Sequence, residues 1–369
     1  MNKFKLVYAT NRNHEGEDRW NPESYGEKFS SDGRQNLRFG EVSLDLDEPT
    51  VQKYLNAEVY GRSGDGEGLS SYVAQKAKTA QIEALNDPTI NGKTKHSSLS
   101  STKTFNHLKT RMMKVKDVVI FIHGFNVDWY KAVGSAVSLQ LMLNRKRKNQ
   151  KEVIVVLFSW PSNGSMFPYR AYISDRHEAR DSGMAIGRGL LKLKDYFLEL
   201  KKQGKEYCNQ SIHLLCHSMG NYALQSAVKT LSYEKGQARL PRLFDQIFMC
   251  SPDVDSNAFE KGGPLFRLPE TCNEISVYFN KGDIAMYLSD YTKANPDRLG
   301  HVGLANPYEV SNKISQIRCT PIIKGSIEHS YYLWASVNDD IRQSIDETPS
   351  DDPKRKRKPD GSPREWKMF

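Results

Sequence analysis

The chain has 369 residues and a formal net charge of +9 at pH 7, and 38% of its residues are hydrophobic, which suffices for a sizeable core in one large or two small domains. No apolar run approaches the length of a membrane span, and the N-terminus lacks the apolar stretch of a signal peptide. The five cysteines include no C-x-x-C spacing, which argues against a disulfide framework, so we expect a soluble, cytoplasmic protein with reduced thiols.

The N-terminal part contains two β-like segments, at residues 5–9 and 37–46, and then a polar insert at 47–116. The glycine-rich run 61–68 lacks the strand-then-helix frame of a nucleotide-binding loop, and we interpret it as a flexible connector. A structureless insert of this size would be unusual in a compact domain. We therefore expect a helix over residues 71–85 together with mobile loops.

Continuous apolar runs then alternate with helical patterns. The runs lie at 118–122, 153–158 and 212–215, and apolar residues at helical spacing follow each of them. This alternation predicts a parallel sheet that is covered by helices on both faces. Two further strands are predicted at 246–250 and 275–279. The pattern indicates the α/β class.

Two runs of basic residues stand out, at 145–148 and 354–358. The first ends an amphipathic pattern, and we interpret it as a solvated helix C-terminus that the helix dipole favours. The second lies in a proline-containing tail, residues 346–369, which we predict to be disordered. Because basic runs are usually solvated, nucleic acid is not the expected partner. We expect one domain over residues 1–345, which includes the insert.

A candidate nucleophile follows the third central strand in the stretch C-H-S-M-G. The stretch resembles the G-x-S-x-G elbow that presents the serine of α/β hydrolases, and here the serine is Ser218. Cys216 replaces the first glycine, and it is small enough to stand in its place. A serine before a helix is often only an N-cap. The order strand, serine, aspartate, histidine nevertheless favours catalysis, because it is the chain order of such triads.

The predicted base is His329, on a short loop after residues 321–323, which could form the last strand. A histidine titrates near neutrality and can take and return the serine proton. His301 is the rival base, whereas we interpret His213 and His217 as structural.

The predicted acid is Asp283, which follows the strand at 275–279 in a Gly-Asp turn. Its carboxylate would set the tautomer of the histidine. Asp253 and Asp255 follow the preceding strand and remain alternatives.

The tetrahedral oxyanion of acyl transfer needs two main-chain donors. We assign them to the N–H groups of Met219 and of Phe125 in the H-G-F-N turn, where Gly124 lets the backbone pass without a side-chain clash. Asn126 and Trp160 are assigned to the substrate pocket.

Three other polar residues near the strand ends receive structural roles. Asp175 and Arg176 are interpreted as caps of a long helix, and Arg12 as a structural brace. No H-E-x-x-H, paired-cysteine ligand set or phosphate loop occurs, so we expect no metal and no cofactor.

Eight motifs spread over most of the chain resemble the bacterial α/β hydrolases that are grouped as an uncharacterised domain of unknown function. They are V-Y-A-T-N-R at 7–12, F-I-H-G-F-N at 121–126, F-S-W-P-S-N-G at 158–164, Y-I-S-D-R-H-E-A at 172–179, H-L-L-C-H-S-M-G-N at 213–221, S-P-D-V-D at 251–255, V-Y-F-N-K-G-D-I-A at 277–285 and H-S-Y-Y at 329–332. The resemblance implies an α/β-hydrolase fold with its nucleophile at Ser218, and it implies no substrate.

These features together predict a serine hydrolase. It would cleave an ester, thioester or related acyl bond of a small-molecule or lipid-like substrate through an acyl-enzyme on Ser218. Two alternatives stay open, because one scaffold hosts many functions. One is a non-catalytic binding or effector module that acts through the insert and the tail, and the other is an acyltransferase that uses the same triad.

Overall fold

The structure is a computed structural model of the chain. It describes residues 2–59, 62–85, 89–90, 93–94, 100–147, 151–162, 168–202, 211–236, 238–286, 297–323 and 328–369. Parts of the polar insert, the start of the glycine-rich run and Cys208 lie outside the described residues. Cys216, Cys250, Cys272 and Cys319 are buried free thiols. None of the helices in the described ranges combines the length and the apolarity that crossing a membrane requires.

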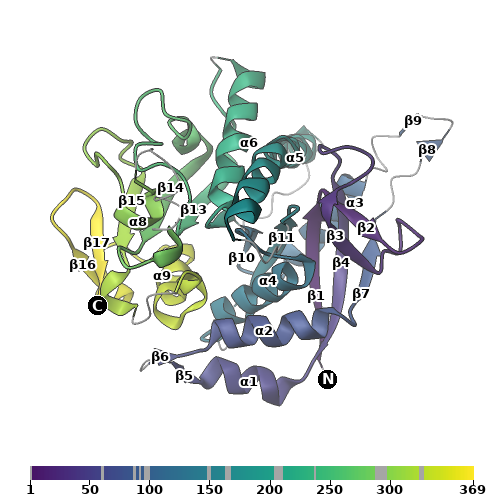
Figure 1. Ribbon diagram of the computed structural model, residues 1–369, viewed down its shortest axis with the longest axis horizontal. Helices are drawn as coiled ribbons and strands as arrows, with labels where there is room; N and C mark the ends of the chain where they lie inside the picture. Colours follow the sequence, from purple (N-terminus) through teal and green to yellow (C-terminus); the bar gives the residue numbers. More distant parts are fainter. Residues whose placement is uncertain are drawn as a thin grey trace.

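Eleven strands of the described chain form one sheet in the order β16-β17-β15-β14-β13-β12-β10-β11-β1-β4-β7 (Figure 1). The strands are β1 (Asn2–Thr10), β4 (Arg38–Leu46), β7 (Gln81–Ala84), β10 (Asp117–Ile122), β11 (Val153–Ser159), β12 (Ile212–His217), β13 (Phe244–Cys250), β14 (Cys272–Phe279), β15 (Ile314–Arg318), β16 (Arg357–Pro359) and β17 (Glu365–Met368). Within this sheet the pairs β1–β4, β4–β7 and β16–β17 are antiparallel, and the other pairs are parallel. The predicted, mostly parallel sheet is therefore confirmed.

Helices cover both faces of the sheet. The main helices are α1 (Glu48–Asn56), α2 (Gly66–Ala77), α3 (Ser100–Met112), α4 (Trp129–Asn144), α5 (Pro168–Lys202), α6 (Gly220–Lys235), α8 (Leu299–Val302) and α9 (Ala335–Ile345). Alternate residues of β10 face opposite sides: Val119 and Phe121 pack in one buried cluster with α2, α4 and α9, whereas Val118 and Ile122 pack in the other with α3, α5 and α6. This arrangement explains the continuous apolar runs, because both faces of each central strand are buried.

Short elements complete the description of the chain. They are the two-stranded sheets β2–β3 (Arg12–Glu15 and Ser24–Phe29), β5–β6 (Glu58–Val59 and Arg62–Ser63) and β8–β9 (Thr89–Ile90 and Lys93–Thr94), and the 3-10 helices η2 (Leu268–Thr271), η3 (Thr320–Ile322), η4 (Tyr331–Leu333) and η5 (Pro353–Arg355). The strand predicted at 321–323 is thus wrong. Among the described residues, the last strand before His329 is β15, and Pro321 follows it in η3, where its missing N–H costs no ladder bond.

The polar insert contributes regular structure to this fold. The helix predicted over 71–85 is α2, which begins and ends earlier, at Gly66 and Ala77. It begins earlier because Asp65 caps its first turn by accepting the Gly68 N–H at 2.7 Å. Residues 81–84 form the edge strand β7 instead. Figure 1 shows α2 lying between α1 and α4. Its backbone approaches α4 closely, since a Cβ at Gly134 would lie 2.4 Å from the Ser70 carbonyl oxygen.

The C-terminal tail is ordered, contrary to the prediction of disorder. β16 and β17 extend the sheet beyond β15. Arg355 and Arg357 of the basic run are buried and both bind Asp340 of α9, at 2.7 Å and 3.3 Å. The side chain of Tyr278 donates to the same carboxylate at 2.7 Å. The run alternates Lys and Arg, and only its arginines point inward, so charge pairing replaces the apolar content that the tail lacks.

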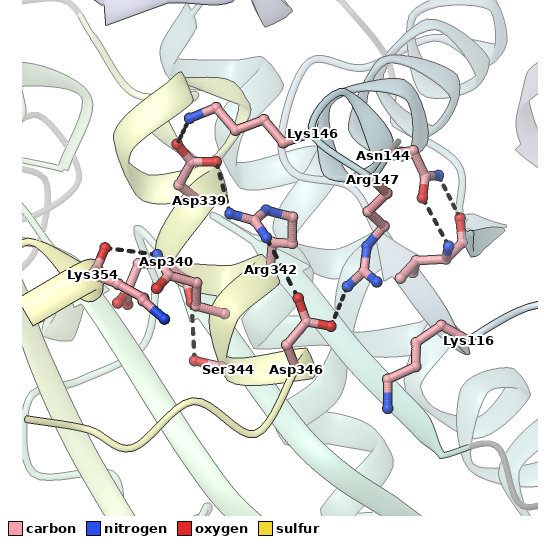
Figure 2. A network of polar contacts seen from close by, with 12 residues as sticks. Lys116, Asn144, Lys146, Arg147, Asp339, Asp340, Arg342, Ser344, Asp346 and Lys354 are labelled. Atoms are coloured by element: carbon pink, nitrogen blue, oxygen red, sulfur yellow. Dashed lines mark hydrogen bonds and ion pairs between the residues drawn. The ribbon is translucent and has the colours of Figure 1, made fainter. Parts of the chain in front are cut away.

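The described part of the basic run at the end of α4, residues 145–147, is also paired rather than solvated. The Arg145 and Lys146 side chains contact Asp339 of α9 at 2.9 Å and 2.6 Å. Figure 2 shows the Arg147 side chain reaching Asp346, the residue that directly follows α9. The two side chains lie 2.5 Å apart. These contacts tie α4 to α9 across one face of the sheet, so the interpretation of this run as a purely solvated helix end is wrong.

Candidate active site

Ser218 sits on a sharp turn between β12 and α6. Its φ of +52° lies in the left-handed region, which costs a non-glycine residue of order 1–3 kcal/mol. The turn is held by a hydrogen bond from the Ser218 N–H to the Cys250 carbonyl oxygen of the next strand, at 2.9 Å. Gly220 is required for it, because a Cβ there would lie 2.6 Å from the carbonyl oxygens of Ile122 and His123. Strained backbone of this kind is typical of a functional site.

Cys216, at the position of the missing first glycine, is fully buried in the strand before this turn. Burial raises the pKa of the Cys216 thiol well above its usual range. The thiolate is the reactive form of cysteine, so this residue is a packing residue and not a competing nucleophile.

His329 and Asp283 are joined directly. The Nδ1–H of His329 donates to Asp283 Oδ2 at 2.7 Å. The other carboxylate oxygen of Asp283 accepts the main-chain N–H groups of Ala285 and Met286, at 3.0 Å and 3.2 Å. Asp283 is buried, whereas His329 is partly exposed, and its Nε2 atom makes no hydrogen bond to a described residue. The pair therefore leaves Nε2 free to exchange a proton.

The alternative acids and the rival base have other partners. Asp253 accepts the Tyr172 hydroxyl at 2.7 Å and lies 3.4 Å from the Arg298 guanidinium. Asp255 forms an ion pair with the same arginine. His301 lies with its Nε2 3.2 Å from the Lys281 carbonyl oxygen. Of the predicted acids, the structure brings only Asp283 to His329.

His329 lies beside the nucleophile turn. Its carbonyl oxygen accepts hydrogen bonds from the Nε2–H of His217, which directly precedes Ser218, at 3.2 Å and from the Ser251 hydroxyl at 3.0 Å. The rings of His217 and His329 are 4.7 Å apart. Within the described part of the chain, Ser218 Oγ makes no hydrogen bond to His329. Such bonds are often long in free enzymes and tighten when substrate binds.

The predicted oxyanion donors, Phe125 and Met219, keep their main-chain N–H groups open. Neither donates a hydrogen bond to another described residue, whereas the two N–H groups after Phe125 are occupied. Asn126 donates to Asp175 Oδ2 and Val127 donates to the Ser162 hydroxyl, both at 3.1 Å. The loop lies against the nucleophile, since a Cβ at Gly124 would be 2.8 Å from that of Ser218.

The two predicted pocket residues differ in position. Asn126 is exposed with a φ of +57°. Trp160 has no exposed surface, so in this structure it cannot contact a substrate. Its ring stacks on His123 at 5.1 Å, and its indole N–H donates to the His123 carbonyl oxygen at 2.8 Å. The assignment of Trp160 to the substrate pocket is therefore wrong, and this residue is a buried support of the loop that begins at His123.

Asp175 and Arg176 do not cap α5, which begins at Pro168, but lie inside it. Asp175 is buried and also accepts the Ser162 hydroxyl. Arg176 lies 3.6 Å from the centroid of the Tyr222 ring, a cation–π contact, and 3.5 Å from Asp253. Both side chains connect α5 to the segments around Ser218.

His123 is a site residue that the sequence did not reveal, although it stands in H-G-F-N. Its ring is buried, with Nδ1 3.0 Å from the Gly124 carbonyl oxygen and Nε2 3.2 Å from the Trp160 N–H. Arg12 lies behind it, and burial lowers the pKa of Arg12 to about 10, so it stays charged at neutral pH. Burial, followed by the charge of Arg12, lowers the pKa of His123 to about 3.

Comparisons with known proteins agree with this architecture. A family model described as alpha/beta hydrolase of unknown function (DUF900) matches residues 97–337. The uncharacterized protein alr1448 of Nostoc sp. is 27% identical over 215 residues, which are 47% of this chain and 54% of that protein. The match therefore spans about half of the relative's length.

Among solved structures, the chain shows low similarity to two enzymes. Aspergillus fumigatus lipase B has a TM-score of 0.36 and 10% identity, over 65% of this chain and 54% of that one. The Pyrobaculum calidifontis esterase has a TM-score of 0.30 and 13% identity, over 63% of this chain and 77% of that one. At these values the similarities support no conclusion about this chain.

Proposed function

The chain belongs to the family of α/β hydrolases of unknown function, and on this basis we propose that it is a serine hydrolase that cleaves an ester, thioester or related acyl bond. The observation that carries the proposal is the 2.7 Å hydrogen bond between His329 and Asp283, next to the strained turn at Ser218. A base that a buried carboxylate orients beside a serine in the left-handed region is the arrangement that an activated nucleophile needs.

In the proposed reaction the Ser218 hydroxyl attacks the acyl carbonyl while His329 Nε2 accepts its proton. Asp283 keeps the histidine in the tautomer with hydrogen on Nδ1 and stabilises the imidazolium that forms. The open N–H groups of Phe125 and Met219 would bind the oxyanion of the tetrahedral intermediate. His329 then returns the proton to the leaving group, and an acyl-enzyme remains. Water, deprotonated by the same histidine, releases the acid and regenerates Ser218.

The substrate in this proposal is a small-molecule or lipid-like acyl compound. The exposed Asn126 stays a candidate for contact with it, because its side chain projects from the loop that carries the Phe125 donor. The proposal needs no group beyond the side chains and main-chain donors of the chain itself.

The direct test is covalent labelling with a fluorophosphonate probe, followed by turnover of a panel of esters and thioesters. We expect the wild type to be labelled and Ser218→Ala to be unlabelled and inactive. Ser226→Ala, on the following helix, is the matched control and should label like the wild type. Equal labelling of wild type and Ser218→Ala would refute the assignment. Product analysis with added alcohols would show whether water or another acceptor takes the acyl group.

A further inference from the structure

Arg12, at the start of β2, is a fully buried cation without a counter-charge in contact. It forms no salt bridge with any carboxylate in the described ranges, and it has no exposed surface. A buried charge without an ion partner is expensive, because its lost hydration is replaced only by hydrogen bonds to neutral groups. Such a residue calls for a role that a neutral side chain could not fill.

The guanidinium joins three segments behind the loop that carries Phe125. Its Nε–H donates to the Ser159 hydroxyl at 2.8 Å, and its Nη1 donates to the Gly26 carbonyl oxygen at 3.0 Å. Its Nη2 donates to the Val127 carbonyl oxygen at 2.7 Å and lies 3.5 Å from His123 Nε2. The planar fork of arginine can satisfy these directions at once, whereas the single ammonium of lysine cannot.

These contacts decide which nitrogen of His123 carries hydrogen. The Trp160 N–H and the Arg12 guanidinium both point at Nε2, so Nε2 is the acceptor and Nδ1 carries the hydrogen. Nδ1–H then donates to the Gly124 carbonyl oxygen at 3.0 Å. That carbonyl belongs to the same planar peptide unit as the Phe125 N–H, and in a trans peptide the two point in opposite directions. The hydrogen bond that fixes the Gly124 carbonyl therefore also fixes the direction of the Phe125 N–H.

We propose that Arg12 is a positioning residue of the oxyanion site, which keeps His123 in this tautomer and grips the Val127 carbonyl so that the Phe125 N–H faces Ser218. The inference rests on the proposed function, because it concerns the donor that would bind the oxyanion. It adds a role for an N-terminal strand that lies outside the segment matched by the family model.

The test compares hydrolysis of an ester and of the matching thionoester by the full-length chain. A thionoester places sulfur, a weak hydrogen-bond acceptor, where the ester has its carbonyl oxygen, so an intact oxyanion site favours the ester. We expect Arg12→Met to lower kcat/KM on the ester about 100-fold with KM nearly unchanged, and to reduce the preference for the ester about tenfold. Arg12→Lys should give intermediate values.

Arg38→Met is the matched control for removing a buried arginine. Arg38 also comes from the N-terminal part, but it contacts Asp32 at 3.0 Å and the ring of Trp20. The variant should keep the wild-type preference for the ester, whatever its effect on Tm. An Arg12→Met enzyme with the wild-type preference would overturn the positioning role.

If Arg12→Met does not fold, two variants at His123 carry the test. His123→Leu cannot bind the Gly124 carbonyl, whereas His123→Asn keeps an amide donor near the Nδ1 position. Loss of the ester preference in the first and its recovery in the second support the inference, and an equal preference in both contradicts it. A wild type that neither hydrolyses esters nor reacts with a fluorophosphonate would instead refute the proposed function.

Discussion

The contact between Gly124 and Ser218 allows a one-methyl test of the proposed oxyanion site. In Gly124→Ala the new Cβ would lie 2.8 Å from Ser218 Cβ, 3.1 Å from the His217 carbonyl oxygen and 3.2 Å from His217 Nδ1. Gly124 is not among the glycines with positive φ, so alanine adds no backbone strain. The whole effect comes from the contact between the loop and the nucleophile turn.

The size of the effect follows from the distance. Ordinary contacts of a Cβ begin at 3.4 Å, so the loop and the turn must separate by at least 0.6 Å, which is 3.4 Å less 2.8 Å. Overpacking of this kind destabilises proteins by about 1–3 kcal/mol. The effect on catalysis should be larger, because loss of one oxyanion donor lowers kcat about 10²- to 10³-fold. We therefore expect kcat to fall about 100-fold while KM changes little.

The assay is steady-state hydrolysis of the best ester found in the panel, with urea denaturation of the same samples. Gly187→Ala is the control, because a Cβ at Gly187 of α5 meets its nearest atoms at 3.5 Å and 3.6 Å and therefore fits. That variant should keep wild-type kcat and gain up to about 1 kcal/mol of stability. A Gly124→Ala enzyme with wild-type kcat would show that the loop does not supply the oxyanion donor.

Two further predictions concern the tail and the loop. Asp340→Asn should lower the free energy of unfolding by about 3 kcal/mol, because Arg355 and Arg357 would both lose the carboxylate charge that they share. Urea denaturation measures this, with the exposed Asp351→Asn as control, and equal stability of the two variants would contradict it. The second prediction concerns pH. The pKa of His123 is about 3 in the folded state and near 6.5 in the unfolded state, so between these pH values the unfolded state binds a proton that the folded state does not. This residue therefore makes the free energy of unfolding fall as pH drops from 6.5 to 3, by up to about 1.4 kcal/mol per pH unit. His123→Asn should lose that part of the acid sensitivity in unfolding curves measured across this range, and parallel pH profiles of both proteins would refute it.

Local patterns in the sequence were sufficient to predict the central strands and the fold class. The apolar runs of β10 to β14 are buried on both faces, so each is recognisable alone, and the family that the motifs resemble is confirmed. The turn at Ser218 could be predicted because its cause is local, namely the small residue Cys216 two places before the serine, near the end of β12, and Gly220 two places after it. Its catalytic role, with those of His329 and Asp283, stays a prediction.

Other features depended on contacts between distant segments. The ordered tail was missed because Arg355 and Arg357 are stabilised by Asp340, which belongs to a helix and lies apart from them in sequence. The contribution of His123 was missed because its tautomer depends on Arg12, more than a hundred residues away.

The amino-acid sequence by itself determined the order of the central strands and helices and the chemical groups at the carboxyl ends of those strands, because hydrophobic periodicity and turn chemistry act between neighbours along the chain. The tertiary structure alone decided which groups meet. Asp283 and Asp253 are both acids that follow strands, but arginines of other segments engage Asp253, and only Asp283 lies within reach of His329. Hydrogen bonds and ion pairs act over a few ångströms, so this choice depends on the folded arrangement and not on spacing in the sequence.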